Sequence, residues 1–295
     1  MKFWDGGLSC FALKPSINSS PRELVYRIPL LVRMTHWLIA FALLVLLVSG
    51  LQIFNAHPSL YWGSASKFDR PFLDIGSAEN ASGEKRGYLR LGSRQWDTTG
   101  VLGLSKGGDG QADARAFPHW ILLPSYQSLG DGRRWHFFFA WCLALGLGLY
   151  FVANFIRGRL RRDLLPTGRD VRGIGRSVLD HLKFRFSHGA RHYNVLQKIA
   201  YLSVMFGLVP LVILTGLALS PGFDAAAPWL LILCGGRQSA RSLHFLGTFA
   251  LVLFVFVHVF HVIAAGPINE MRSIITGWFF VREPAEKTTE EGDLK

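Results

Sequence analysis

The sequence contains little charge and few cysteines. Only 18% of its 295 residues are charged, whereas soluble proteins carry about 25%. Its three cysteines, Cys10, Cys142 and Cys234, form no C-x-x-C motif, which excludes a disulfide framework, a thiolate-ligated iron–sulfur cluster and a c-type haem attachment. Half of the residues are apolar and the mean hydropathy is +0.26. This composition excludes a disordered chain and indicates a membrane protein.

Four apolar runs are each long enough to cross the ~30 Å hydrocarbon core of a bilayer, which takes about 20 apolar residues in a helix. Because backbone groups inside a bilayer must satisfy their own hydrogen bonds, runs without period-2 alternation predict helices. The sequence therefore predicts an all-α membrane protein, a four-helix transmembrane bundle with a long outer loop between the first two helices. The predicted spans cover residues 30–54, 135–156, 195–219 and 242–265.

The formal net charge of +12 lies mainly in one segment. Residues 157–194 hold ten Lys/Arg against three Asp, a net +7 of the total. Because this segment joins two apolar runs, the positive-inside rule explains its charge better than nucleic-acid binding does. We therefore expect residues 157–194 to form a basic cytoplasmic loop, and the chain to have no nucleic-acid partner.

Alternation of the spans then places both termini, residues 1–29 and 266–295, in the cytoplasm and the loop 55–132 outside. This outer loop is balanced, with eight Lys/Arg and eight Asp/Glu. Arg133 and Arg134 oppose the rule, from which long loops are largely exempt. Residues 1–29 lack the apolar core of a signal peptide, so the first span is expected to act as the insertion signal. Weak alternation over residues 88–91 predicts a strand in a small outer cap, and residues 282–295 are expected to be solvated.

Five of the ten histidines lie in or at the ends of the predicted spans, where ionisable side chains indicate function. His244 and His258 are fourteen residues apart, so helical geometry puts them within ~40° of one face and ~21 Å apart along the axis. The directions of the spans put His136 at the depth of His244, and His36 at the depth of His258. His261 is turned by ~100° from His244 and competes with His258 as the inner residue of this helix.

Two imidazole pairs at two depths suit two bis-histidine haem b groups, because neutral imidazole is a good iron ligand and bundles bind cofactors between facing helices. Any one of these histidines could instead only hydrogen-bond the backbone. A histidine-based transporter, or a proton or metal relay without haem, is the alternative function, although two histidines at each depth leave zinc short of ligands. A catalytic haem protein of the ferric reductase kind would need an open iron position. The loop histidines, expected to be solvated, are His57, His119, His181, His188 and His192.

The glycines and the arginines near these histidines each have two possible roles. Three glycines could make room for a macrocycle, or could only permit close helix packing. Three arginines could pair with haem propionates, or could extend to the interface as snorkelling side chains. The glycines are Gly50, Gly146 and Gly148, and the arginines are Arg33, Arg134 and Arg241.

Several of these features form a recognisable set over residues 25–266. They are Arg33-Met34-Thr35-His36-Trp37 and Ser49-Gly50-Leu51 in the first span, Gly132-Arg133-Arg134-Trp135-His136 at the second, and the fourteen-residue histidine spacing in the fourth. The chain thereby resembles the di-haem cytochrome b subunits of formate dehydrogenases, nickel–iron hydrogenases and thiosulfate reductases. The stretches 194–198 and 215–221 look most like the thiosulfate-reductase branch.

The resemblance implies an electron-transfer subunit in the bacterial inner membrane that anchors a catalytic oxidoreductase subunit. It implies electron transfer between that partner, with a molybdopterin enzyme favoured, and quinone in the membrane lipid. Carried over by position, His36 and His258 are expected to bind the inner haem b, and His136 and His244 the outer one. The outer loop is longer than in many relatives, so it is a possible docking surface for the partner.

A quinone site needs a hydrogen-bonding group near a haem edge and an apolar slot for the tail. Asn194, Gln197 and Lys198, at the inner end of the third span, are the candidates, with Tyr201 one turn deeper. Interfacial polar residues are common, so these groups could equally have no such role. Pro210 is expected to kink the third span, with neighbouring groups taking up the freed carbonyl.

Overall fold

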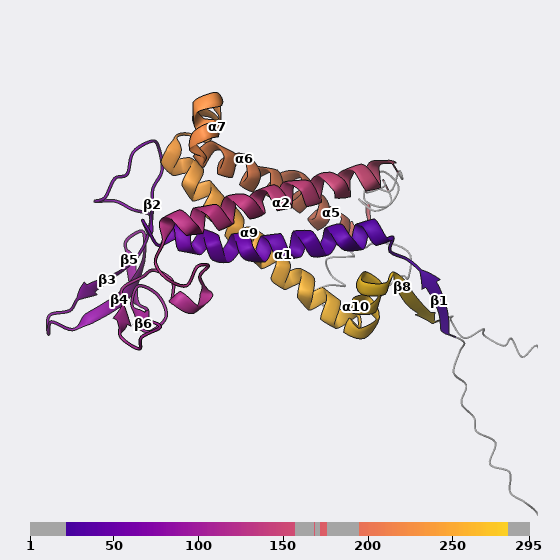
Figure 1. Cartoon of the computed structure of the whole chain (residues 1–295), viewed down its shortest axis with the longest axis horizontal. Helices are drawn as coiled ribbons and strands as arrows, with labels where there is room; N and C mark the ends of the chain where they lie inside the picture. The colour runs from indigo at the N-terminus through magenta and orange to yellow at the C-terminus, as the bar shows by residue number, and fades with distance from the viewer. Residues whose placement is uncertain (1–21, 157–167, 169–171, 176–194, 283–295) are drawn as a thin grey trace, which may run out of the picture.

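The computed structural model describes residues 22–156, 168, 172–175 and 195–282. Four helical segments dominate it, and all four are long and apolar enough to cross a membrane, so the predicted helical membrane bundle is confirmed. Figure 1 shows them along the length of the molecule. They are α1 (Leu30–Phe54), α2 (Leu129–Ile156), the third span Val195–Leu219 and α9 (Arg237–Ala265).

Two helices begin earlier than their apolar runs. Helix α2 starts six residues before residue 135, because Ser128 and Asp131 cap it: the Asp131 amide donates to Ser128 Oγ (3.2 Å), and Ser128 Oγ donates to the Asp131 carboxylate (2.9 Å). The cap thus satisfies one of the first amides of the helix, which have no acceptor within the helix. Helix α9 starts five residues before residue 242, with polar residues that bind the loop between α1 and α2. Hydropathy finds the apolar part of each helix and misses its polar first turns.

The third span contains an irregular turn next to Pro210. It consists of α5 (Val195–Ser203), a π-helical turn η3 (Val204–Leu208) and α6 (Val209–Leu219). Proline has no amide to donate to the carbonyl four residues earlier. The Val209 amide donates instead to Val204 O, the longer hydrogen bond of a π turn. The chain thus accommodates Pro210 by widening one turn within the span.

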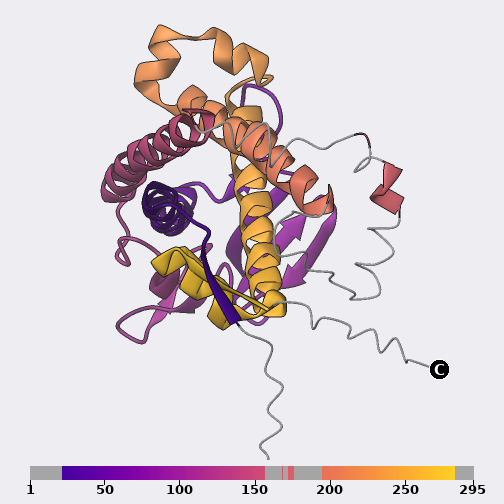
Figure 2. The same ribbon diagram turned by 90° about the vertical axis from the view of Figure 1, so that its right-hand side faces the viewer.

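The helices pack as two close pairs. Helices α1 and α2 share a core of Ala42, Val45, Phe139 and Leu143, while α6 packs on α9 where Gly247 faces Val212. Figures 1 and 2 show α9 inclined across the α1–α2 pair. Helix α9 therefore passes α2 at one depth and α1 at another.

The end of the bundle that carries the loop between α1 and α2 is called the sheet end. The loop forms an antiparallel sheet in the order β2-β3-β4-β5, a small addition to the helical fold. Its core residues Leu60, Ile75 and Phe117 pack on Phe54 of α1, so the sheet is fixed to the bundle. The loop elements are β2 (Ser59–Leu60), β3 (Leu73–Glu79), β4 (Lys85–Leu91), β5 (Arg94–Asp97), β6 (Ser105–Lys106), β7 (Ala112–Asp113) and η1 (His119–Ile121).

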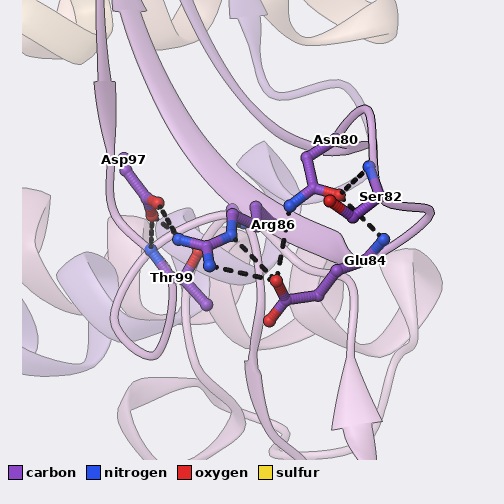
Figure 3. A network of polar contacts seen from close by, with 7 residues as sticks. Asn80, Ser82, Glu84, Arg86, Asp97 and Thr99 are labelled. Atoms are coloured by element: carbon purple, nitrogen blue, oxygen red, sulfur yellow. Dashed lines mark hydrogen bonds and ion pairs between the residues drawn. The ribbon is translucent and has the colours of Figure 1, made fainter.

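A polar network holds the exposed end of this sheet (Figure 3). In the β3–β4 turn, Asn80 Oδ1 accepts the amides of Ser82 (3.0 Å) and Glu84 (2.9 Å). Arg86 then bridges Glu84 (3.0 Å) and Asp97 (2.9 Å). Hydrogen bonds from the Thr99 hydroxyl and amide, together with Arg86, lower the pKa of Asp97 to about 2. Exposed ion pairs individually contribute little to the free energy of folding. This network therefore fixes the conformation of the β3–β4 turn more than it stabilises the fold.

A short segment of the loop is bound directly to the first turns of α9. Ser242 Oγ donates to Tyr61 O (2.6 Å), the Gly63 amide donates to Ser239 Oγ (2.8 Å), and Arg241 donates to His57 O. Ser242 is fully buried and Ser239 nearly so. The short helices α7 (Pro221–Ala226) and α8 (Trp229–Leu233) connect α6 to α9 at the same end. The loop therefore covers the sheet end of the bundle.

At the opposite end of the bundle, called the ribbon end, the segment before α1 pairs with the segment after α9. Strand β1 (Arg22–Tyr26) pairs antiparallel with β8 (Trp278–Arg282), and α10 (Pro267–Thr276) lies between α9 and β8. Arg33 of α1 donates to Ile275 O (2.6 Å), which ties α10 to the first span. Residues 266–282 are thus folded onto the bundle, a non-local pairing that the sequence did not predict; residues 283–295 lie outside the described residues.

The sequence led us to expect a solvated His57. In the structure this residue is half-buried. Its ring stacks on Tyr61 (centroids 5.6 Å apart) and meets the edge of Phe68 (5.7 Å). Its Nε2 is buried and has no hydrogen-bond partner among the described residues. Burial, and then the charge of Arg241, lower the pKa of His57 against an opposing effect of Asp74. The folded loop therefore favours the neutral ring.

We predict that the attachment of the loop to α9 weakens as the pH falls below about 6.5, the ordinary pKa of histidine. A lowered folded-state pKa means that the unfolded segment binds the proton first, so the stabilisation is complete above the ordinary pKa and is lost as the pH falls through the folded value. Hydrogen exchange of residues 57–66 at about pH 8 and about pH 5.5 measures this. His57→Gln should abolish the difference in protection; an equal loss in both proteins would contradict the assignment to His57.

Candidate functional site

Four histidines form two pairs, and each pair contains one histidine of helix α9. The ring centroids of His36 on α1 and His258 on α9 are 6.5 Å apart, and those of His136 on α2 and His244 on α9 are 6.1 Å apart. We call His136 and His244 the sheet-end pair, and His36 and His258 the ribbon-end pair. His261 contacts its own helix, with Nδ1 2.7 Å from Val257 O. Facing imidazoles thus occur at two depths of the bundle.

The ring of His136 is held through Nδ1. This nitrogen lies 3.1 Å from Leu46 O and 3.2 Å from Ser49 Oγ, both on α1. Gly50 follows Ser49, and a Cβ at that position would come within 3.3 Å of His136 Cε1. The imidazole therefore lies directly against the α1 backbone, and its Nδ1 edge is fixed.

The ring of His244 is held in the same way by the third span. Its Nδ1 lies 3.0 Å from Val212 O and 3.1 Å from Thr215 Oγ1, both on α6. A Cβ at Gly216 would come within 3.1 Å of His244 Cε1. A carbonyl, then a hydroxyl three residues later, then a glycine thus contact each imidazole of the sheet-end pair. In both cases Nε2 is left for a group between the rings.

The ribbon-end pair has different surroundings. His36 Nδ1 is buried and has no hydrogen-bond partner among the described residues, and the ring meets Trp37 edge-on (5.4 Å). The ring of His258 stacks on Phe254 (6.1 Å), which in turn meets Tyr201 of α5 (6.3 Å). The third span therefore approaches this pair through two aromatic rings. An orphaned buried nitrogen in the pair fits a site that binds a further group.

The predicted arginines have protein partners. Arg33 donates to Ile275 O, and Arg134 pairs with Asp131 (3.2 Å). Arg241 lies over the Phe54 ring (5.6 Å) and donates to His57 O in the loop between α1 and α2. The contacts of Arg33 and Arg241 join separate elements, whereas that of Arg134 lies within the first turns of α2. Arg134 is the exposed one of the three, with 85% of its side chain accessible.

The predicted polar residues of the third span are partly described. Asn194 lies outside the described residues, whereas Gln197 and Lys198 form part of α5. Lys198 is buried, with 9% of its surface exposed. Gln197 and Tyr201 are four residues apart and so share one helix face, the face from which Tyr201 contacts Phe254.

The three glycines named from the sequence differ. Gly50 contacts the His136 ring, and Gly146 packs on Leu38 and Ile39, where a Cβ would meet Ile39 Cγ1 at 3.1 Å. A Cβ at Gly148 would meet no atom within 4 Å. Gly146 is thus explained by close helix packing, and Gly50 by the imidazole.

Sequence reasoning assigned no role to Ser49, Thr215 or Gly216. A signal was present, because Ser49-Gly50-Leu51 and Thr215-Gly216-Leu217 occupy equivalent places in the first and third spans. The agreement is too short to reveal an internal repeat without the contacts to the two imidazoles.

Fold and site together define a helical membrane protein with paired intramembrane imidazoles, the arrangement of a membrane cytochrome b. The chain belongs to the prokaryotic cytochrome b561 family, whose sequence pattern matches residues 27–277. It is also similar to a protein of Azospira oryzae that bears the name protein-methionine-sulfoxide reductase subunit YedZ1. The two are 30% identical over 229 residues, which cover 77% of this chain and 85% of the relative.

This membership confirms the resemblance to membrane cytochrome b subunits. It makes the chain a membrane haem b protein with a role in electron transfer to a partner. It also favours haem over the histidine-based transporter as the reason for intramembrane imidazoles.

We predict that Gly50→Ala and Gly216→Ala each destabilise the protein and lower its haem content, because the new methyl group displaces an imidazole. Overpacking of this kind costs about 1–3 kcal/mol. Gly148→Ala is the matched control, since open space and better helix propensity make it neutral or stabilising by about 0.5–1 kcal/mol. Thermal unfolding and haem b absorbance of the purified proteins measure both effects. Equal behaviour of the three variants would contradict the proposed contacts.

Proposed function

We propose that the chain is a di-haem cytochrome b that carries electrons between membrane quinone and a partner oxidoreductase. The observation that carries the proposal is the presence of two facing imidazole pairs at two depths of one bundle. One pair would serve a single haem b. Two pairs stacked across the membrane provide two sites between opposite faces.

The ring spacing supports bis-histidine coordination in each pair. A metal–imidazole bond is about 2.0–2.1 Å long, so two imidazoles whose ring centroids are about 6 Å apart are close enough to hold one metal atom. The observed values are 6.5 Å and 6.1 Å. His36 with His258 and His136 with His244 are therefore the proposed haem ligands. The bound haem supplies the reversible one-electron chemistry.

The chain's own residues supply ligands, orientation and exclusion of water. Hydrogen bonds at Nδ1 orient His136 and His244, and the loop covers the sheet end above them. The ribbon end is proposed to be cytoplasmic, because the basic segment 157–194 follows α2 there and positive charge favours the inside. Both termini are then cytoplasmic, in the inner membrane of a bacterium.

The partner is proposed to be a catalytic oxidoreductase subunit, of the molybdopterin type. Two findings support a catalytic partner: the resemblance to anchoring cytochrome b subunits, and the name of the Azospira oryzae relative as a reductase subunit. The folded outer loop offers a surface for it, since three of its tryptophans are exposed: Trp62 (50%), Trp96 (45%) and Trp120 (74%).

Quinone is proposed to bind at the ribbon end, near the inner end of the third span. Tyr201 and Phe254 connect this span to His258, and Gln197 lies one turn from Tyr201 on the same face. An amide beside aromatic rings and lipid-exposed apolar side chains suits a quinone head group and tail. Asn194 is the other candidate named from the sequence.

We predict that His36→Ala and His136→Ala each remove one of two haems, leaving about half of the haem b per chain. His261→Ala is the matched control, because this residue lies on α9 three residues after His258 and its Nδ1 contacts Val257 O of its own helix; it should retain both haems. Pyridine haemochrome assays on purified protein give the ratios. One haem per wild-type chain, or a colourless protein with bound zinc, would contradict the di-haem proposal.

We further predict that Gln197→Ala slows reduction of the haems by a quinol analogue several-fold while the haem content stays unchanged. Ile199→Ala, on a different face of α5, should retain the wild-type rate. Stopped-flow absorbance of the haem bands measures the reaction. Equal rates in all three proteins would exclude Gln197 from the quinone site.

A further inference from the structure

The hydroxyl groups of Ser49 and Thr215, beside the sheet-end pair, donate their protons to backbone carbonyls of their own helices. Ser49 Oγ donates to Val45 O (2.6 Å), and Thr215 Oγ1 donates to Leu211 O (2.7 Å), in each case one turn earlier in the same helix. Both residues are buried, with 0% and 1% of their surfaces exposed. Each oxygen can therefore only accept a hydrogen bond from the imidazole it faces.

A second acceptor faces each imidazole nitrogen. Leu46 O lies 3.1 Å from His136 Nδ1, and Val212 O lies 3.0 Å from His244 Nδ1. A nitrogen between two oxygen acceptors is stable only when it carries the proton. The surroundings thus fix the tautomer with Nδ1 protonated, which leaves the lone pair of Nε2 free to bind a metal.

We propose that Ser49 and Thr215 are matched positioning residues that hold the reduction potential of the sheet-end haem low. The inference rests on the proposed haem ligation. A histidine ligand that donates its other N–H becomes a more basic ligand. A more basic ligand stabilises ferric iron over ferrous iron, and axial ligands and their hydrogen bonds are established determinants of haem potential.

The ribbon-end pair provides an internal contrast. Thr35 precedes His36 and is buried, but its hydroxyl donates to Leu31 O (2.9 Å) and contacts no histidine in the described part of the chain. Thr248, one turn after His244, likewise donates to its own helix at His244 O (2.8 Å). Helical hydroxyls that donate to their own helix are thus present near both pairs, and among the described residues Ser49 and Thr215 are the ones within hydrogen-bond distance of an imidazole nitrogen.

The test is a redox titration of the haem bands in the full chain, with His36→Ala as background so that the sheet-end haem is observed alone. Ser49→Ala and Thr215→Val should each shift its midpoint potential to a more positive value, and the double variant should shift it further. Ser49→Thr and Thr215→Ser retain the hydroxyl and should restore the original potential. In the His136→Ala background, which leaves the ribbon-end haem, Ser49→Ala should cause no shift.

Thr248→Val and Thr35→Val are the matched controls and should leave the sheet-end potential unchanged. Haem that stays bound in Ser49→Ala and Thr215→Val with an unchanged midpoint would overturn the inference while leaving the di-haem function intact. A shift of the same size in the Thr248→Val control would also overturn it, because the effect would then not require the imidazole contact. Absence of haem from the wild-type chain would instead refute the proposed function itself, so the two failures are distinguishable.

Discussion

The contact of imidazole rings across helix interfaces is the constraint on which the rest of the structure depends. A histidine inside the hydrocarbon region is costly unless both ring nitrogens are used. At the sheet end, Nδ1 of each ring is satisfied by a carbonyl and a hydroxyl of the neighbouring helix, which leaves Nε2 available to a further group. The close pairs α1–α2 and α6–α9, and the glycines that permit them, follow from this requirement. Helix α9 supplies one ring at each depth and must therefore cross between the other helices (Figure 1).

The parts outside the membrane restrict access to the two ends of this arrangement. At the sheet end, the loop binds the first turns of α9 through Ser239 and Ser242 and packs its own core on Phe54. At the ribbon end, the pairing of β1 with β8 and the contact of Arg33 with α10 join the start of the first span to the segment after the last. At each end, the structure is attached to α9 or to the segment that follows it. The depth of each histidine pair is therefore fixed relative to the surfaces where electrons would enter and leave.

Much of this was predictable from local sequence, and most of the exceptions share a physical cause. Hydropathy located the first and third spans, and fourteen-residue spacing placed His244 and His258 on one face, because both patterns lie within single helices. The polar first turns of α9, the pairing of β1 with β8 and the half-buried state of His57 all depend on partners distant in sequence. Ser49 and Thr215 were missed for the same reason. The role of a hydroxyl beside a glycine becomes evident only when an imidazole from another helix contacts it. The first turns of α2 were missed because their local cap is polar and gives no hydropathy signal.

We propose that each imidazole pair holds one haem iron. A cryo-EM map of the purified, haem-loaded protein in a lipid nanodisc tests it most directly. We expect two porphyrin densities, one held by His136 and His244 and one held by His36 and His258. Rings in direct contact without a porphyrin between them, or a single porphyrin ligated by other residues, would contradict it.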